Sequence, residues 1–219
     1  MYTYELINNH YIINIGGYRF LLDTGSKDSF WMHQGPSELV INNKNYLLSE
    51  RPEHFDIKET EELIGTSVDG FIGMDIIHQT SLTIYKNGLM AFEALNEKGK
   101  FVQIDDYGLL AYKAQVGSTV GECIIDTGAK YGYAINNVFN GLTPYDCVND
   151  YNPILKHLRS NIYHVDVDTG AIQAIVDICY NSRVANQLRF LGAIMIANIT
   201  SLFDEACVID IKKGLMVLR

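Results

Sequence analysis

Short runs of alternating apolar and polar residues, separated by turns rich in glycine and asparagine, dominate this chain. Two of the runs share one plan: an alternating segment, a glycine-marked turn, and a second apolar segment that ends in Asp-Thr-Gly. They are Tyr11–Ser26 (YIINIGGYRFLLDTGS) and Tyr112–Ala129 (YKAQVGSTVGECIIDTGA). Alternation interrupted by glycine is typical of a β-hairpin. The pattern predicts a mainly β protein, all-β with short helices, in which a hairpin leads into each Asp-Thr-Gly triplet.

Two further pairs of segments recur in the same order. Phe71-Ile72-Gly73 matches Phe190-Leu191-Gly192, and a short apolar stretch follows each of them. Thr83–Phe92 matches Val208–Leu218, and both contain Gly-Leu-Met. Three matching elements in one order predict an internal duplication.

The duplication divides the chain into two lobes of the same fold. We expect one lobe in residues 1–97 and the other in residues 98–219. The polar, glycine-containing stretch from Asn96 to Lys100 would join them. Together the lobes would form one bilobal unit with pseudo-twofold symmetry.

Other local patterns predict smaller elements. They are a hairpin over Ser37–Leu48 that turns at Asn42-Asn43, a hairpin over His164–Ile178 that turns at Asp168-Thr169-Gly170, short helices after Gly73 and Gly192, and a helix around Tyr151–Leu158.

Charge and composition exclude several classes of function. The net charge of −9 and the lack of a basic stripe argue against a nucleic-acid partner. No apolar run approaches the roughly 18 residues that a membrane span needs. The N-terminus lacks the pattern of a signal peptide, so we expect a cytoplasmic protein without membrane insertion. The four cysteines and six histidines form no zinc-binding spacing, so no metal or cofactor is expected.

Two Asp-Thr-Gly triplets provide a chemistry that one triplet alone cannot. Two adjacent carboxyl groups cannot both ionise easily, so they share a proton and one apparent pKa rises. The ionised group can draw a proton from water while the protonated group donates to a carbonyl oxygen. Two equivalent loops related by a pseudo-twofold axis would bring Asp23 and Asp126 together in this way.

The order apolar-apolar-Asp-Thr-Gly-Ser/Ala, followed later by apolar-apolar-Gly, resembles the pepsin/retropepsin class of aspartic peptidases (clan AA). Ile64–Ile77 (IGTSVDGFIGMDII) is similar to the corresponding segment of retropepsin-like proteins, and Asp23–Trp31 (DTGSKDSFW) is similar to a pepsin stretch. The resemblance covers nearly the whole chain. It implies a bilobal acid protease fold with two fused lobes on one chain, acting as a monomeric pseudo-dimer.

The resemblance also implies a role for each residue of the two triplets. Asp23 and Asp126 would be the catalytic pair, and Thr24 and Thr127 would form a hydroxyl lock across the lobes. The supporting backbone would come from Gly25, Gly128, Ser26 and Ala129. Ser26 would donate to the outer oxygen of Asp23, whereas Ala129 cannot do so for Asp126. Fewer donors depress a carboxyl pKa less, which predicts a pH optimum nearer neutral than strongly acidic.

Three other residues are candidates for substrate binding. Asp168 belongs to a third Asp-Thr-Gly, which lacks the preceding apolar pair and is interpreted as a hairpin tip, the flap of the second lobe. Tyr46 either covers the cleft or packs on a sheet. Trp31 either lines the cleft wall or anchors the core.

The predicted activity is that of an aspartic endopeptidase that hydrolyses peptide bonds of an extended substrate held between the lobes. A small chain without a basic prosegment favours a dedicated processing protease over a digestive enzyme. The alternative is a catalytically degenerate peptide-binding module of the same fold. In either case the partner is a peptide or protein.

Overall fold

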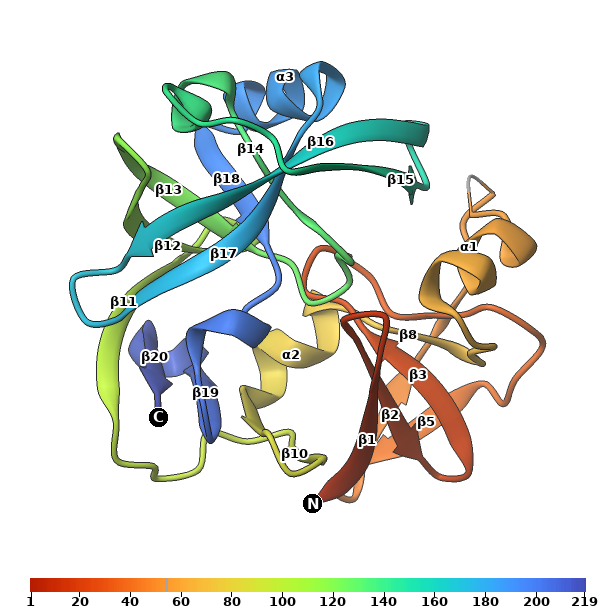
Figure 1. The fold of residues 1–219 in the computed structure, drawn as a ribbon. Helices are drawn as coiled ribbons and strands as arrows, with labels where there is room; N and C mark the ends of the chain where they lie inside the picture. Colours follow the sequence, from red (N-terminus) through yellow and green to blue (C-terminus); the bar gives the residue numbers. More distant parts are fainter. Residues whose placement is uncertain (54) are drawn as a thin grey trace.

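The computed structural model describes residues 1–53 and 55–219 (Figure 1). Strands make up 48% of it, with three short α-helices in the described part, so the prediction of a mainly β protein is confirmed. The helices are α1 (Ile57–Ile64), α2 (Met74–Thr80) and α3 (Ser182–Phe190), and single 3₁₀ turns are η1 (Asn136–Phe139), η2 (Thr200–Leu202) and η3 (Ile211–Lys213).

A closed barrel of six strands lies within the second half of the chain, residues 98–219. Its strands are β12 (Leu110–Val116), β13 (Thr119–Ile125), β14 (Gly132–Ala134), β16 (Lys156–Asp168), β17 (Gln173–Tyr180) and β18 (Ala193–Ala197). Around the barrel the order is β12-β13-β18-β14-β17-β16, and β16 closes it on β12. The β13–β18 and β14–β17 pairs are parallel and the others antiparallel, so the barrel is mixed.

Four of these pairings recur in the first half, residues 1–97. The strands involved are β2 (His10–Ile15), β3 (Tyr18–Leu22), β4 (Phe30–Trp31), β7 (Ser49–Glu50) and β8 (Gly70–Ile72). They pair in the order β2-β3-β8-β4-β7, with the same alternation of antiparallel and parallel neighbours. A separate hairpin, β5 (Glu38–Ile41) and β6 (Lys44–Leu47), turns at Asn42-Asn43 as predicted. Both asparagines have positive φ, the backbone that a two-residue hairpin turn requires.

A third, fully antiparallel sheet is shared by the two halves. Its order is β11-β20-β19-β9-β10-β1, where the strands are β1 (Tyr2–Ile7), β9 (Leu82–Tyr85), β10 (Leu89–Ala91), β11 (Lys100–Asp106), β19 (Ala206–Asp210) and β20 (Leu215–Leu218). The matched segments that contain Gly-Leu-Met form its hairpins β9–β10 and β19–β20. The largest cluster of buried apolar side chains runs through this sheet from one half to the other, including Ile84 and Ile209.

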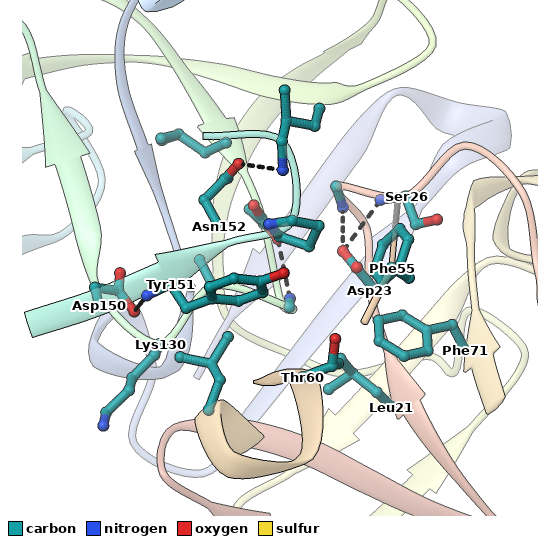
Figure 2. A pocket seen from close by; sticks show the side chains of 18 of the residues that line it. Leu21, Asp23, Ser26, Phe55, Thr60, Phe71, Lys130, Asp150, Tyr151 and Asn152 are labelled. Carbon is teal, nitrogen blue, oxygen red and sulfur yellow. Dashed lines mark hydrogen bonds between the residues drawn. The ribbon is translucent and has the colours of Figure 1, made fainter. Parts of the chain in front are cut away.

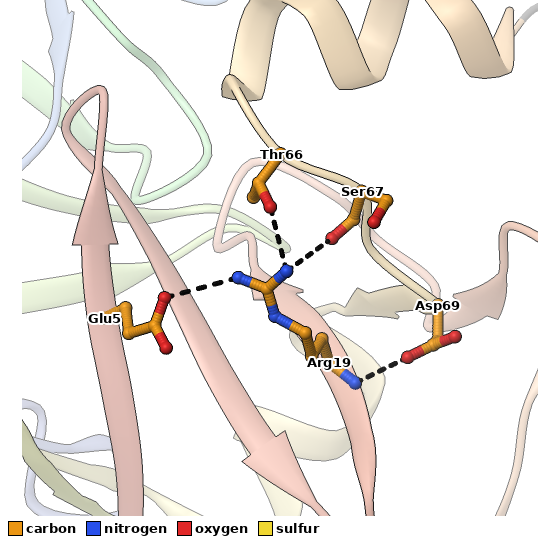
Figure 3. A network of polar contacts seen from close by, with 5 residues as sticks. All are labelled: Glu5, Arg19, Thr66, Ser67 and Asp69. Carbon is orange, nitrogen blue, oxygen red and sulfur yellow. Dashed lines mark hydrogen bonds and ion pairs between the residues drawn. The ribbon is translucent and has the colours of Figure 1, made fainter.

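Arg19 on β3 fastens the strand that leads to Asp23 (Figure 3). Its guanidinium forms an ion pair with Glu5 of β1 at 3.3 Å and donates to the hydroxyl of Thr66 at 2.8 Å and the carbonyl oxygen of Ser67 at 3.2 Å. Its backbone N–H donates to Asp69 Oδ2 at 2.7 Å. These contacts join β1, β3 and the segment before β8, and so fix the register of the parallel β3–β8 pair.

The helix predicted around Tyr151–Leu158 is wrong. The segment is a hairpin of β15 (Asp146–Asn152) and the long strand β16. The Asn152 side chain accepts hydrogen bonds from the N–H groups of Ile154 and Leu155, both at 2.9 Å, and this closes a turn at Pro153. Burial alternates beyond the turn, as a strand requires. The predicted turn at 168–170 does connect β16 to β17.

The match of Gly73 with Gly192 is also wrong. Helix α2 does begin after Gly73, but strand β18, not a helix, follows Gly192. The structural counterpart of Gly73 is Asn198, because Asp23 N–H donates to the preceding Ile72 carbonyl at 2.9 Å and Asp126 N–H donates to the Ala197 carbonyl at 3.0 Å. Gly192 instead follows a helix, as Gly65 does. Each has positive φ, and they directly follow α1 and the last turn of α3 respectively.

Candidate functional site

The two Asp-Thr-Gly loops meet through reciprocal hydrogen bonds between their threonines. The Thr127 hydroxyl accepts from Thr24 N–H at 3.0 Å and donates to the Leu22 carbonyl at 2.8 Å. The Thr24 hydroxyl accepts from Thr127 N–H at 3.0 Å and donates to the Ile125 carbonyl at 2.8 Å. Both threonines are fully buried. The four bonds are equivalent in pairs, so the loops are held in a symmetric arrangement.

Each glycine of the triplets packs against the opposite carboxyl group. A Cβ atom on Gly25 would lie 2.7 Å from Asp126 Cγ, and one on Gly128 would lie 2.4 Å from Asp23 Cγ. Both distances are shorter than van der Waals contact, so only glycine fits. The two aspartates are therefore brought side by side.

Backbone donors of each loop hold its own carboxylate. Asp23 Oδ1 accepts from Gly25 N–H at 2.9 Å and Ser26 N–H at 3.1 Å, and Asp126 Oδ1 accepts from Gly128 N–H at 3.0 Å. Burial raises the pKa of Asp126 well above its usual value, and the charge and hydrogen bond of Asp23 raise it further. Burial also raises the pKa of Asp23, although these amides and Asp126 oppose the shift. One of the two carboxyl groups is therefore readily kept protonated.

The role predicted for the Ser26 hydroxyl is wrong. It donates to the carbonyl oxygen of Asp28 at 3.0 Å, and only the backbone N–H of Ser26 reaches the Asp23 carboxylate. The N–H of Ala129 donates to the Asp126 carbonyl at 3.2 Å, as that of Ser26 does to the Asp23 carbonyl. The near-neutral pH optimum stays a prediction, and its support is now the burial of the pair.

A cavity of about 400 Å³ lies beside the two aspartates, a size within the range of small-ligand sites (Figure 2). Both halves of the chain contribute to its mainly apolar walls. The first half supplies Leu21, Phe30, Phe55, Leu63, Ile64 and Phe71, and the second half supplies Tyr133, Tyr151, Leu158, Val184, Leu188, Leu191 and Ile196. Apolar surroundings strengthen electrostatic interactions at the aspartates.

The β15–β16 hairpin extends from the barrel toward α1 and contributes its turn to the cavity lining (Figure 1). His157 Nε2 of β16 lies 3.4 Å from Glu59 Oε1 of α1, so the hairpin of the second half contacts the helix of the first. Sequence reasoning missed this element. The alternation of apolar residues after Asn152-Pro153 was the available signal for a hairpin.

Three polar residues of the cavity were also missed. The Tyr133 hydroxyl donates to Asp150 Oδ2 at 2.7 Å, and Asp150 Oδ1 accepts from Tyr151 N–H at 2.9 Å. Burial raises the pKa of the Asp150 carboxyl. His10 also lines the cavity and is fully buried, and burial lowers its pKa to about 4. Its imidazole is therefore neutral at physiological pH.

The three predicted substrate-binding residues lie outside the cavity lining. Trp31 is buried against Tyr18 and Phe20, with ring centroids 5.1 Å apart in both cases, so the core-anchor interpretation fits it. Tyr46 is buried on β6, and the Lys44 ammonium lies 4.9 Å from its ring centroid. Asp168 is the last residue of β16, at the opposite end of that strand from the β15–β16 turn. Its carboxylate accepts from nearby groups of that turn. The flap assignment for this turn is wrong, since the strand runs away from the cavity.

Within residues 1–53 and 55–219, no cluster of three or more His, Cys, Asp or Glu side chains could hold a metal ion. The helices of this same region are too short to cross a membrane. No protein-family model matches the chain, and no curated protein sequence is significantly similar to it. The geometry and chemistry of the site are therefore what indicate its function.

Proposed function

We propose that the protein is an aspartic endopeptidase in which Asp23 and Asp126 activate water between them. The observation that carries the proposal is the reciprocal packing of the two Asp-Thr-Gly loops, which sets two buried carboxyl groups side by side. A structural ion pair would need opposite charges. Two neighbouring buried carboxyl groups with raised pKa values destabilise the folded state. Such a pair therefore indicates a chemical function that uses the shared proton.

The chemistry needs only these carboxyl groups and one water molecule. The ionised carboxylate takes a proton from water as the oxygen attacks the peptide carbonyl carbon, and the protonated carboxyl donates its proton to the carbonyl oxygen. The resulting tetrahedral diol then collapses. A proton passes to the amide nitrogen, the C–N bond breaks, and a carboxylic acid and an amine leave.

The proposal includes the finer fold. Residues 1–97 and 98–219 would be two lobes of a pepsin/retropepsin-like unit, which acts as a monomer on a peptide or protein substrate. The recurring β-pairing of the two halves and the sheet that they share support it. The cytoplasmic location and the task of a dedicated processing enzyme stay predictions.

The test is cleavage of a diverse peptide library from pH 3 to pH 8, read by mass spectrometry. Wild type is compared with Asp23→Asn, Asp126→Asn and, as a matched control, Asp168→Asn in the third Asp-Thr-Gly. We expect cleavage by wild type and the control, its loss in the other two variants, and inhibition by a statine-type compound. Cleavage that survives Asp23→Asn or Asp126→Asn would refute the proposal. Binding of peptides with no cleavage at any pH would favour the peptide-binding module.

A further inference from the structure

Helices α1 and α3 occupy corresponding places in the two halves. Each helix precedes the strand, β8 or β18, that pairs in parallel with the strand leading into Asp-Thr-Gly. Thr60 on α1 and Gln187 on α3 both line the cavity beside the aspartates. Each wall helix thus presents one hydrogen-bonding side chain to the cavity.

The Thr60 hydroxyl has no hydrogen-bond partner among the described residues, although the side chain is only 2% exposed. A helical threonine commonly satisfies its hydroxyl on the carbonyl four residues earlier. Thr80 does this in α2, donating to the Ile76 carbonyl at 3.0 Å. The Thr60 hydroxyl points instead toward the cavity, between Tyr151 and Leu21 (Figure 2). A buried hydroxyl without a partner is unfavourable, which calls for an explanation at a cavity wall.

The surroundings of Thr60 are apolar. Leu21, Phe55 and Phe71 share its wall of the cavity. The Thr60 hydroxyl is therefore a single polar group in a part of the wall that otherwise favours contact with apolar groups of a ligand. Such a surface fits a side chain with an apolar body and a hydrogen-bonding end, because the hydroxyl both donates and accepts.

Gln187 is the hydrogen-bonding side chain that α3 adds to the cavity lining. It is half-buried, and its side-chain amide makes no hydrogen bond within the described part of the chain. Its helical neighbours in the lining, Val184, Leu188 and Leu191, are apolar. The second wall thus repeats the pattern of one polar group in an apolar surface.

We propose that Thr60 and Gln187 determine substrate specificity, each by hydrogen bonding to the polar end of a large substrate side chain on one side of the scissile bond. The inference rests on the proposed peptidase function and adds the substrate class: peptides with tyrosine-like side chains flanking the cleaved bond.

The test compares peptides that differ only by Tyr or Phe at the residue on either side of the cleaved bond. We measure kcat/KM with wild type and Kd by calorimetry with the full-length Asp126→Asn variant. A single neutral hydrogen bond predicts about a three- to tenfold preference for Tyr at each position. Thr60→Val removes the preference at one position and Gln187→Met removes it at the other. Thr60→Ser retains the hydroxyl and restores the first preference.

Thr80→Val is the matched control, because it loses a helical hydroxyl outside the cavity and keeps both preferences. Thermal unfolding of every variant shows whether it is folded. Preferences unchanged by Thr60→Val and Gln187→Met, or equally lost in Thr80→Val, overturn the inference. Preferential binding of the Tyr peptides without cleavage would refute the peptidase function but not the specificity inference. Cleavage with no preference between Tyr and Phe would refute the specificity inference but not the peptidase function. Wild type that neither binds nor cleaves any peptide overturns both.

Discussion

Replacing either threonine of the junction between the two triplets by valine tests whether the reciprocal bonds hold the halves together. Valine keeps the shape of threonine and removes only the hydroxyl. Thr127→Val deletes the bond from Thr24 N–H and the bond to the Leu22 carbonyl. Thr24→Val deletes the two equivalent bonds of the other loop.

The magnitude follows from what each variant leaves behind. A fully buried N–H group and a fully buried carbonyl group lose a partner at a site that is closed to water. Each unsatisfied group costs about 1–2 kcal/mol, so each variant should lose about 2–4 kcal/mol of the free energy of unfolding. For a chain of this length, a loss near 3 kcal/mol lowers Tm by roughly 6–12 °C. The matching bond lengths predict nearly equal losses in the two variants.

Urea unfolding followed by circular dichroism measures the loss, with Thr80→Val as the control for removing a threonine hydroxyl elsewhere. A loss below about 1 kcal/mol in either variant would mean that water or a shifted loop satisfies the freed groups. A large inequality between Thr24→Val and Thr127→Val would refute the symmetric junction.

Three further predictions address the aspartates and the cavity. Gly128→Ala places a Cβ 2.4 Å from Asp23 Cγ and so displaces that carboxyl group. We expect kcat on a cleaved peptide to fall at least about 100-fold. Full activity would show that the loop can shift to accommodate the methyl group without displacing Asp23. Because the pKa of Asp126 is raised in the folded state, folded protein retains a proton that unfolded chain loses above about pH 4, and stability falls as pH rises toward the folded pKa. Asp126→Asn cannot lose this proton, so its free energy of unfolding relative to wild type should rise between pH 3.5 and pH 7, by about 1.4 kcal/mol for each unit by which the pKa is raised, measured by urea unfolding. A constant difference would contradict the raised pKa. Thr60→Val removes a buried unpaired hydroxyl and should raise the free energy of unfolding by about 1 kcal/mol, whereas a lower Tm would reveal a hydrogen bond at that hydroxyl.

The features that sequence predicted well are local ones. The hairpins that lead into the triplets combine short, largely apolar strands with glycines at positive φ, as at Gly16-Gly17 and Gly117. The duplicated triplet also identified Asp23 and Asp126 as neighbours, because equivalent loops in repeated units meet at the axis that relates them. Neither inference required knowledge of distant contacts.

The features that sequence missed depend on tertiary contacts or on ambiguous local patterns. Apolar-apolar-Gly fits the C-terminus of a helix, as at Gly192, as well as the end of a strand, as at Gly73. The segment around Tyr151 becomes a strand because it pairs with β16 and packs near α1. The sequence gives no indication of the role of Thr60. That role is inferred from its unpartnered hydroxyl in a cavity wall that several distant segments build.

The shared sheet has a consequence for how the protein assembles. The one ladder that joins the two halves within it, among the described residues, is β9–β19, with Thr83 opposite Val208 and Ile84 opposite Cys207. Cutting the chain between residues 97 and 98 would leave each fragment with an open, apolar strand edge, which readily pairs with other chains. The short link keeps the two edges at a high effective concentration, so they find each other before they meet another molecule. Correct pairing is thus a first-order event whose rate does not depend on how much protein the cell contains.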